Sequence, residues 1–235
     1  MSTLSANARS GSAATASSRV ARMKIAAALV LIAGAVATVP LATRLSGPQF
    51  NPQPHEALGQ VLAEEAGKLV APGGGVTLIA LDTSAYPNPS ADFIVQGFLR
   101  TARELRLKLA ATNWIELDPI RLARVPPGDF FEILRNRSEG EVVVSLLGPP
   151  LLAEEQRAKL VRKPPRIVAL CSGELPKQVN LGNLFQRDLL HTAIICRPQP
   201  AVGPPAANNP RAWFDHYYQV ITRANLAELP APNPS

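Results

Sequence analysis

The sequence predicts an α/β domain built on a five-stranded, mostly parallel sheet with helices on both faces. Short, continuous apolar runs alternate with segments of helical periodicity, which is typical of strands that are covered on both sides. Hydrophobic residues make up 46% of the 235 residues, enough for one core. Clusters of prolines at 48–54, 198–210 and 230–234 mark the linkers and edges.

The predicted strands are the apolar runs at 76–81, 109–117, 142–147, 166–171 and 192–196. Apolar residues at steps of three and four predict helices over 55–70, 88–105, 127–137, 151–161, 176–190 and 211–223. The last of these has an aromatic face, which could dock on the core or bind a partner. Right-handed crossovers restrict the topology, and a flavodoxin-like strand order 2-1-3-4-5 is the first choice.

An uncharged segment over residues 25–42 precedes the domain. As a helix it is roughly 27 Å long, close to the thickness of a bilayer core. Arg9, Arg19, Arg22 and Lys24 precede it and Arg44 follows, so the N-terminus is expected inside and the domain outside. The segment is expected to be a transmembrane anchor. Ala35 and Ala37 also fit a cleaved secretory signal, which places the domain in the same compartment.

The positive charge of the chain lies mostly around this apolar segment. The net charge is +6, and the five cations just named account for nearly all of it. The folded part is therefore close to neutral and lacks a basic surface for phosphate backbones, so no nucleic-acid partner is predicted. The expected organisation is a disordered tail 1–24, the anchor 25–42, a linker 43–54, the α/β domain 55–223 and a Pro-rich tail 224–235.

Polar residues follow the predicted strands, and these are the candidate ligand-binding residues. In open α/β sheets ligands bind beyond the carboxyl ends of the strands. Asp and Ser are also common turn residues, so turn chemistry is the alternative. The candidates are Asp82, Thr83, Ser84, Tyr86, Asp118, Ser172 and Arg197.

Cys171 and Cys196 end neighbouring predicted strands and are the only cysteines of the chain. An oxidising compartment permits a disulfide between them, and two buried free thiols are the alternative. Only His191 lies near them in sequence, so no metal site is predicted, and no C-x-x-C redox motif is present. No cofactor is predicted, since the glycines at 73–75 precede a strand instead of following one.

The stretch from Val76 to Arg197 resembles one lobe of a type I periplasmic sugar-binding protein. The second lobe of that family is missing, and its ligands bind between two lobes. The resemblance implies an open ligand rim at the strand ends. The matching features are Tyr86-Pro-Asn-Pro89, Gly97, Ala102-Arg-Glu-Leu105, the helix over 129–137, Gly140-Glu-Val-Val-Val144 and Ile167-Val-Ala-Leu170.

These observations predict a non-enzymatic, membrane-anchored extracytoplasmic domain that binds a small molecule or a partner protein at the strand ends. A structural or assembly component of a cell-envelope complex is the alternative. A hydrolase or transferase using Asp82 or Ser84 is the third reading, and it lacks a catalytic motif such as G-x-S-x-G.

Overall fold

The computed structural model describes residues 50–116, 124–160, 164–198, 203, 205 and 209–230. The chain divides into two compact units, Met1–Phe50 and Asn51–Ser235, and the second contains the α/β domain. The predicted tail 1–24 and anchor 25–42 lie outside the described residues. Across the described ranges, no helix is both long and apolar enough to cross a membrane.

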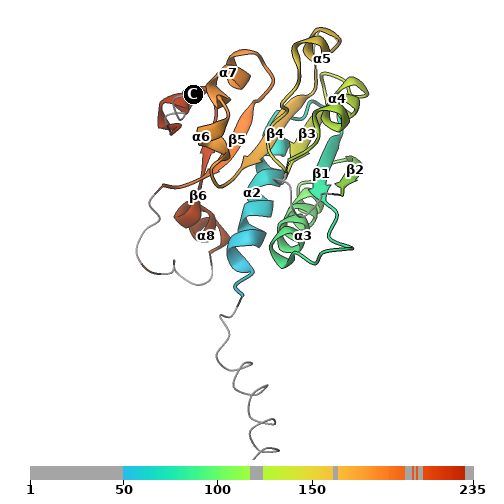
Figure 1. Cartoon of the computed structure of the whole chain (residues 1–235). Helices are drawn as coiled ribbons and strands as arrows, with labels where there is room; N and C mark the ends of the chain where they lie inside the picture. The colour runs from blue at the N-terminus through green and yellow to red at the C-terminus, as the bar shows by residue number, and fades with distance from the viewer. Residues whose placement is uncertain are drawn as a thin grey trace, which may run out of the picture. The chain divides into compact units, whose positions relative to one another are not determined.

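The domain is built on a six-stranded sheet with the order β2-β1-β3-β4-β5-β6 (Figure 1). The strands are β1 (Val76–Leu81), β2 (Leu109–Ile115), β3 (Val142–Ser145), β4 (Arg166–Cys171), β5 (Thr192–Cys196) and β6 (Tyr218–Ile221). The first five are parallel and in the predicted order 2-1-3-4-5. Their apolar runs are buried on both faces in β1, β3 and β4, as continuous β-branched segments require.

The sixth strand corrects the predicted helix over 211–223. Helix α8 (Pro210–Tyr217) ends at Tyr217, and Tyr218–Ile221 then pairs antiparallel with β5. Tyr218, Val220 and Ile221 favour a strand, because β-branched and aromatic side chains fit a pleated surface. The edge of β5 also offers unpaired backbone groups, which the helix could not satisfy.

Three helices cover one face of the sheet: α2 (Gln53–Leu69), α3 (Pro89–Glu104) and α8. Their apolar faces pack on Leu78, Val144, Val168 and Ile194. Asn88 caps α3 by accepting a hydrogen bond from the Ala91 amide at 3.2 Å, which explains why the helix begins there.

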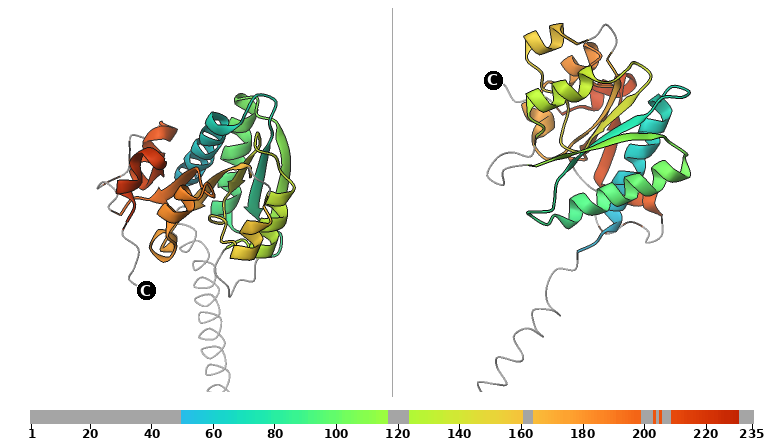
Figure 2. Two further views of the ribbon diagram at one scale, coloured as in Figure 1. Left: turned by 90° about the horizontal axis from the view of Figure 1, so that it is seen from above. Right: turned by 90° about the vertical axis from the view of Figure 1, so that its right-hand side faces the viewer.

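The opposite face is covered by shorter helices, α4 (Pro127–Arg135), α6 (Leu175–Gln178), α7 (Leu181–Gln186) and the 3-10 helix η1 (Arg223–Glu228). Phe130, Leu134 and Phe185 fill this second core. The predicted helix 151–161 is reduced to α5 (Glu154–Ala158), and the predicted helix 176–190 is divided into α6 and α7 at Val179. Figure 2 shows helices on both sides of the strands.

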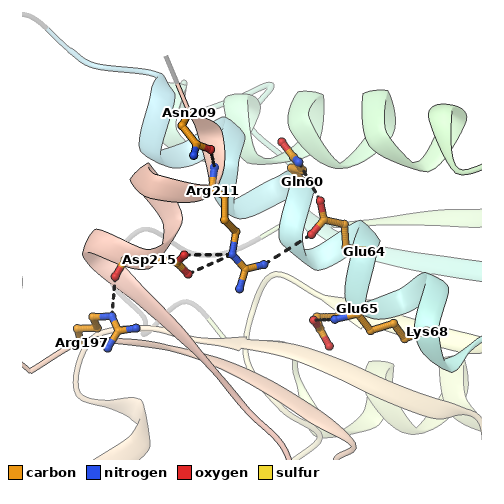
Figure 3. A network of polar contacts seen from close by, with 8 residues as sticks. All are labelled: Gln60, Glu64, Glu65, Lys68, Arg197, Asn209, Arg211 and Asp215. Carbon is orange, nitrogen blue, oxygen red and sulfur yellow. Dashed lines mark hydrogen bonds and ion pairs between the residues drawn. The ribbon is translucent and has the colours of Figure 1, made fainter. Parts of the chain in front are cut away.

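An ion pair between Arg211 and Glu64 joins helix α8 to α2, and contacts within each helix hold the two side chains in place (Figure 3). Arg211 lies 3.1 Å from Asp215 and 3.7 Å from Glu64, which also accepts a hydrogen bond from Gln60 at 2.8 Å. Trp213 and Phe214 are buried against the sheet beneath this network. The aromatic face of α8 therefore docks on the core, one of the two roles that the sequence left open.

Candidate functional site

The candidate site is a cavity of about 270 Å³ at the carboxyl ends of β3 and β4. The chain leaves β1 toward β2 in one direction and leaves β3 toward β4 in the other, so the switch point of the sheet lies between β1 and β3. The cavity lies one strand pair away from this switch point, at the carboxyl end of the sheet, the end at which open α/β sheets bind their ligands. We call this cavity the rim cavity.

The rim cavity has an apolar floor and a polar border. Leu146, Leu147, Leu170 and Leu175 form the floor, and the border is formed by Arg124, Ser172, Glu174 and Gln178, with Gly148 and Gly173 in the loops. The Arg124 guanidinium donates a hydrogen bond to Gln178 Oε1 at 2.5 Å, which holds both side chains at the border. Glu174 lies 3.1 Å from Lys177 Nζ on the solvent side.

Gly148 allows the loop after β3 to approach α6 closely. Its φ of 92° lies in the left-handed region, where side chains are strained. A Cβ on Gly148 would also lie 3.0 Å from Leu175 Cδ1, so glycine keeps the floor of the rim cavity closed without displacing that leucine.

Of the predicted site residues, Ser172 lines the rim cavity. Asp82 accepts a hydrogen bond from the Ser84 amide at 2.9 Å, and this bond lowers the pKa of the Asp82 carboxyl. Thr83 Oγ1 donates to Asp92 at 2.7 Å and so fastens the loop to α3. Contacts of this kind correspond to the alternative prediction, in which these polar residues stabilise a turn and do not bind a ligand.

Two further predicted residues, Tyr86 and Arg197, lie away from the rim cavity. Tyr86 is on the same loop as Asp82 and is 63% exposed. Arg197 donates its Nε–H to the Asp215 carbonyl at 2.6 Å and so supports α8 (Figure 3). Asp118 lies outside the described residues.

Of the two alternatives left open by the sequence, the structure has the free thiols and no disulfide between Cys171 and Cys196. In the register of β4 and β5, Cys171 is paired with Ile195, and Cys196 is the next residue. Side chains alternate along a strand, so the two cysteines point to opposite faces of the sheet. Cys171 is buried in the second core, where burial raises the pKa of its thiol, and Cys196 is exposed.

A scan against models of known protein families gave no match, and neither did a search of curated proteins. The fold is similar to that of sugar-transporter solute-binding proteins. One from Agrobacterium radiobacter, in complex with D-arabinose, is 12% identical with a TM-score of 0.47, over 74% of this chain and 61% of that one. One from Burkholderia graminis, also with D-arabinose, is 13% identical with a TM-score of 0.48, over the same shares.

A third similar structure is a sugar-binding protein from Bacillus halodurans, 12% identical over 75% of this chain, with a TM-score of 0.47. The chain spans 61–64% of the length of these three proteins. The names of these three proteins describe the kind of transporter binding protein that the sequence resembles, and the similarity is one of fold. Likeness at this level carries no argument about function.

A second hollow, of about 360 Å³, lies at the amino end of β5, beside the carboxyl end of β6. Its polar side chains are already paired with one another or with the backbone. Arg223 lies 2.6 Å from Asp188, and Lys68 Nζ lies 2.5 Å from the buried Glu65. Within the described ranges no group of His, Cys, Asp and Glu could hold a metal ion. We therefore assign a structural role to this hollow.

His191 makes this second hollow sensitive to pH. Its Nδ1 accepts a hydrogen bond from the Ile167 amide at 3.1 Å, which requires an unprotonated Nδ1. Burial lowers the pKa of His191 below 6.5, against the raising effect of Asp188, while Arg166 and Arg223 lower it further. The unfolded chain therefore binds the proton more readily than the folded one. The unprotonated His191 side chain therefore stabilises the folded state. This contribution to the free energy of unfolding is complete above pH 6.5 and is lost as the pH falls toward the folded-state pKa.

We therefore expect the free energy of unfolding to decrease between pH 7.5 and pH 5, and to decrease less in His191→Asn. The asparagine Oδ1 keeps an acceptor for the Ile167 amide but does not titrate. Burial also lowers the pKa of His55, so both proteins retain that contribution and their difference isolates His191. Urea unfolding at a series of pH values measures the effect, and equal pH dependence in the two proteins would contradict it.

Proposed function

We propose that the chain is a non-enzymatic, extracytoplasmic binding domain, anchored through residues 25–42, that holds a small hydroxylated molecule in the rim cavity. The observation that supports this proposal is the lining of the rim cavity. An apolar floor of leucines under a border of Arg124, Ser172, Glu174 and Gln178 combines burial with directed hydrogen bonds. Ligand sites commonly have this composition.

The border contains both donors and acceptors, and this mixture selects the ligand class. Arg124 offers only donors, Glu174 only acceptors, and Ser172 and Gln178 offer both. A molecule with several hydroxyl groups satisfies such a border, since each hydroxyl donates and accepts. The volume of about 270 Å³ is below that of most drug-sized sites, so the expected ligand has the size of a monosaccharide.

The extracytoplasmic location and the anchor are supported by the sequence. The uncharged segment 25–42 is preceded by four cations and followed by one. This charge asymmetry favours an orientation with the N-terminus in the cytoplasm. Protease treatment of intact spheroplasts, with an antibody against each end of the chain, tests the orientation: only the domain should be digested.

Binding is tested with the full-length protein in detergent by thermal shift and then by calorimetry. D-Arabinose, the sugar named for two of the similar structures, is the first probe, followed by other pentoses, hexoses and polyols. We expect at least one of them to raise the melting temperature. Failure of the whole panel would overturn the proposal.

Arg124→Ala is expected to weaken the affinity for that ligand about 10- to 100-fold. A hydrogen bond from a charged donor contributes about 1.5–3 kcal/mol, and 1.4 kcal/mol corresponds to a factor of ten. Arg135→Ala is the matched control, because Arg135 is an exposed arginine on α4 that pairs with Glu132 away from the rim cavity. Equal affinities of the Arg124→Ala and Arg135→Ala variants would show that binding occurs elsewhere.

An assembly role, the alternative predicted from the sequence, is favoured by a different surface. Strand β2 lies at the edge of the sheet with Trp114 53% exposed. This surface is separate from the rim cavity, so assembly and ligand binding do not exclude each other.

A further inference from the structure

The rim cavity holds more uncompensated positive charge than negative charge. Among the described residues that line it, only Arg124 and Glu174 are charged. The protein satisfies these two charges to different degrees, as the partners of each side chain show. This difference decides which kind of hydroxylated molecule the rim cavity selects.

Glu174 contributes little negative charge to the rim cavity. Its two carboxylate oxygens lie 3.2 and 3.1 Å from Lys177 Nζ, so both are already close to a cation. The side chains of Glu174 and Lys177 are 64% and 45% exposed, and water therefore screens the remaining charge. Glu174 can still accept a hydrogen bond from a ligand hydroxyl, since each carboxylate oxygen has more than one lone pair.

The charge of Arg124, in contrast, is not neutralised. Within the described ranges no carboxylate lies at ion-pair distance from its guanidinium, which donates instead to the neutral side chain of Gln178 at 2.5 Å. Arg124 is also partly buried. A cation that is partly withdrawn from water is destabilised unless an anion compensates it. The rim cavity therefore has close to one uncompensated positive charge.

Hydrogen-bond donors also exceed acceptors at this part of the border. A guanidinium has only donors, and Arg124 uses one of them on Gln178 Oε1. Because Oε1 receives that bond, Gln178 offers mainly its NH₂ group to a ligand. A single hydroxyl group would leave most of these donors unmatched, whereas a carboxylate accepts through both of its oxygens.

We infer that the ligand of the rim cavity is a monosaccharide acid, an inference that rests on the proposed function because it concerns the same site. Its carboxylate binds Arg124 and Gln178, and its hydroxyl groups bind Ser172 and Glu174. The planar guanidinium forms two parallel hydrogen bonds with a carboxylate, which fixes the orientation of the acid. The leucine floor contacts the carbon atoms of the sugar.

The charge of the rim cavity favours a carboxylate over a phosphate. A phosphate monoester carries nearly two negative charges at neutral pH, and a carboxylate carries one. Arg124 is the only cation among the described lining residues, so it matches the charge of a carboxylate. The second charge of a phosphate would have no counter-ion there and would be repelled by Glu174.

Calorimetry of the full-length protein in detergent tests the inference with matched ligands. D-Arabinose, D-glucose and D-galactose are each compared with their acids, D-arabinonate, D-glucuronate and D-galacturonate, and the phosphate monoester of D-glucose is included. We expect at least one acid to bind about tenfold or more tightly than its neutral partner, because charge-assisted hydrogen bonds are the stronger ones. This preference should decrease as the salt concentration rises.

The outcomes separate this inference from the proposed function. If the neutral sugars bind as tightly as their acids, or if the phosphate ester binds more tightly than the acids, the inference is overturned and the proposed function stands. Failure of acids and neutral sugars alike would overturn both.

Arg124→Gln tests the origin of the preference for the acid. The glutamine retains a hydrogen-bonding group but has no charge, so the affinity for the acid should fall about tenfold or more and the affinity for the neutral sugar much less. Arg135→Gln is the matched control, since Arg135 pairs with Glu132 away from the rim cavity. Circular dichroism establishes that both variants are folded. An undiminished preference for the acid in Arg124→Gln would contradict the assignment of the carboxylate to Arg124.

Discussion

Gly97→Ala is expected to destabilise the protein by about 3 kcal/mol, the upper end of the cost of overpacking a core. Helices α2 and α3 cross in contact at Gly97 and Gly59. A Cβ on Gly97 would lie 2.3 Å from the Glu56 carbonyl oxygen and 2.9 Å from its Cα. These atoms belong to the α2 backbone, so neither can rotate away, and the two helices must separate.

Urea unfolding followed by circular dichroism measures this change in stability. Gly67→Ala is the matched control in the same pair of helices. Its Cβ would meet leucine side-chain carbons no closer than 3.6 Å, an ordinary van der Waals contact. Since alanine favours a helix over glycine by about 1 kcal/mol, this variant should be unchanged or slightly more stable. Equal stabilities of Gly97→Ala and Gly67→Ala would contradict the close packing of α2 and α3.

Phe214→Ala is expected to cost about 3–5 kcal/mol, the usual range for removal of a buried phenylalanine ring. Phe214 is 1% exposed and packs in the core formed by α2, α8 and the sheet. Its loss would leave a cavity where α8 docks and would loosen the turn into β6. The same urea titration measures the effect.

Tyr86→Ala provides the comparison, because Tyr86 is 63% exposed and its removal leaves no cavity. Its unfolding free energy should stay within about 0.5 kcal/mol of wild type. If Phe214→Ala were equally mild, the aromatic face of α8 would not be part of the core, and the partner-binding alternative for that face would be supported.

The strands were the most predictable part of the fold. Arg166–Cys171 and Thr192–Cys196 have the predicted bounds, because an apolar run of five or six residues rich in β-branched side chains is typical of a buried strand and too short for a helix. The end of α8 was not predictable in this way. Apolar residues from Trp213 to Ile221 fit helical spacing, and the strand at Tyr218 forms because β5 provides a partner.

The site was predicted only in outline. The carboxyl ends of the strands follow from the parallel topology, and that argument selected Ser172, which lines the rim cavity and whose role in binding stays a prediction. Arg124 and Gln178 were not found, because no short motif links them. They are 54 positions apart, and a hydrogen bond of 2.5 Å joins them only after α4 and α6 pack on the same face.

The sequence by itself determined the alternation of strands and helices and the order of the first five strands, because apolar periodicity and crossover handedness are local properties of the chain. Only the tertiary structure decided three other features: that β6 extends the sheet, that Cys171 and Cys196 face opposite sides, and that Arg124 joins the rim cavity. Each depends on register or packing between segments distant in sequence, and no local pattern encodes which partners those segments meet.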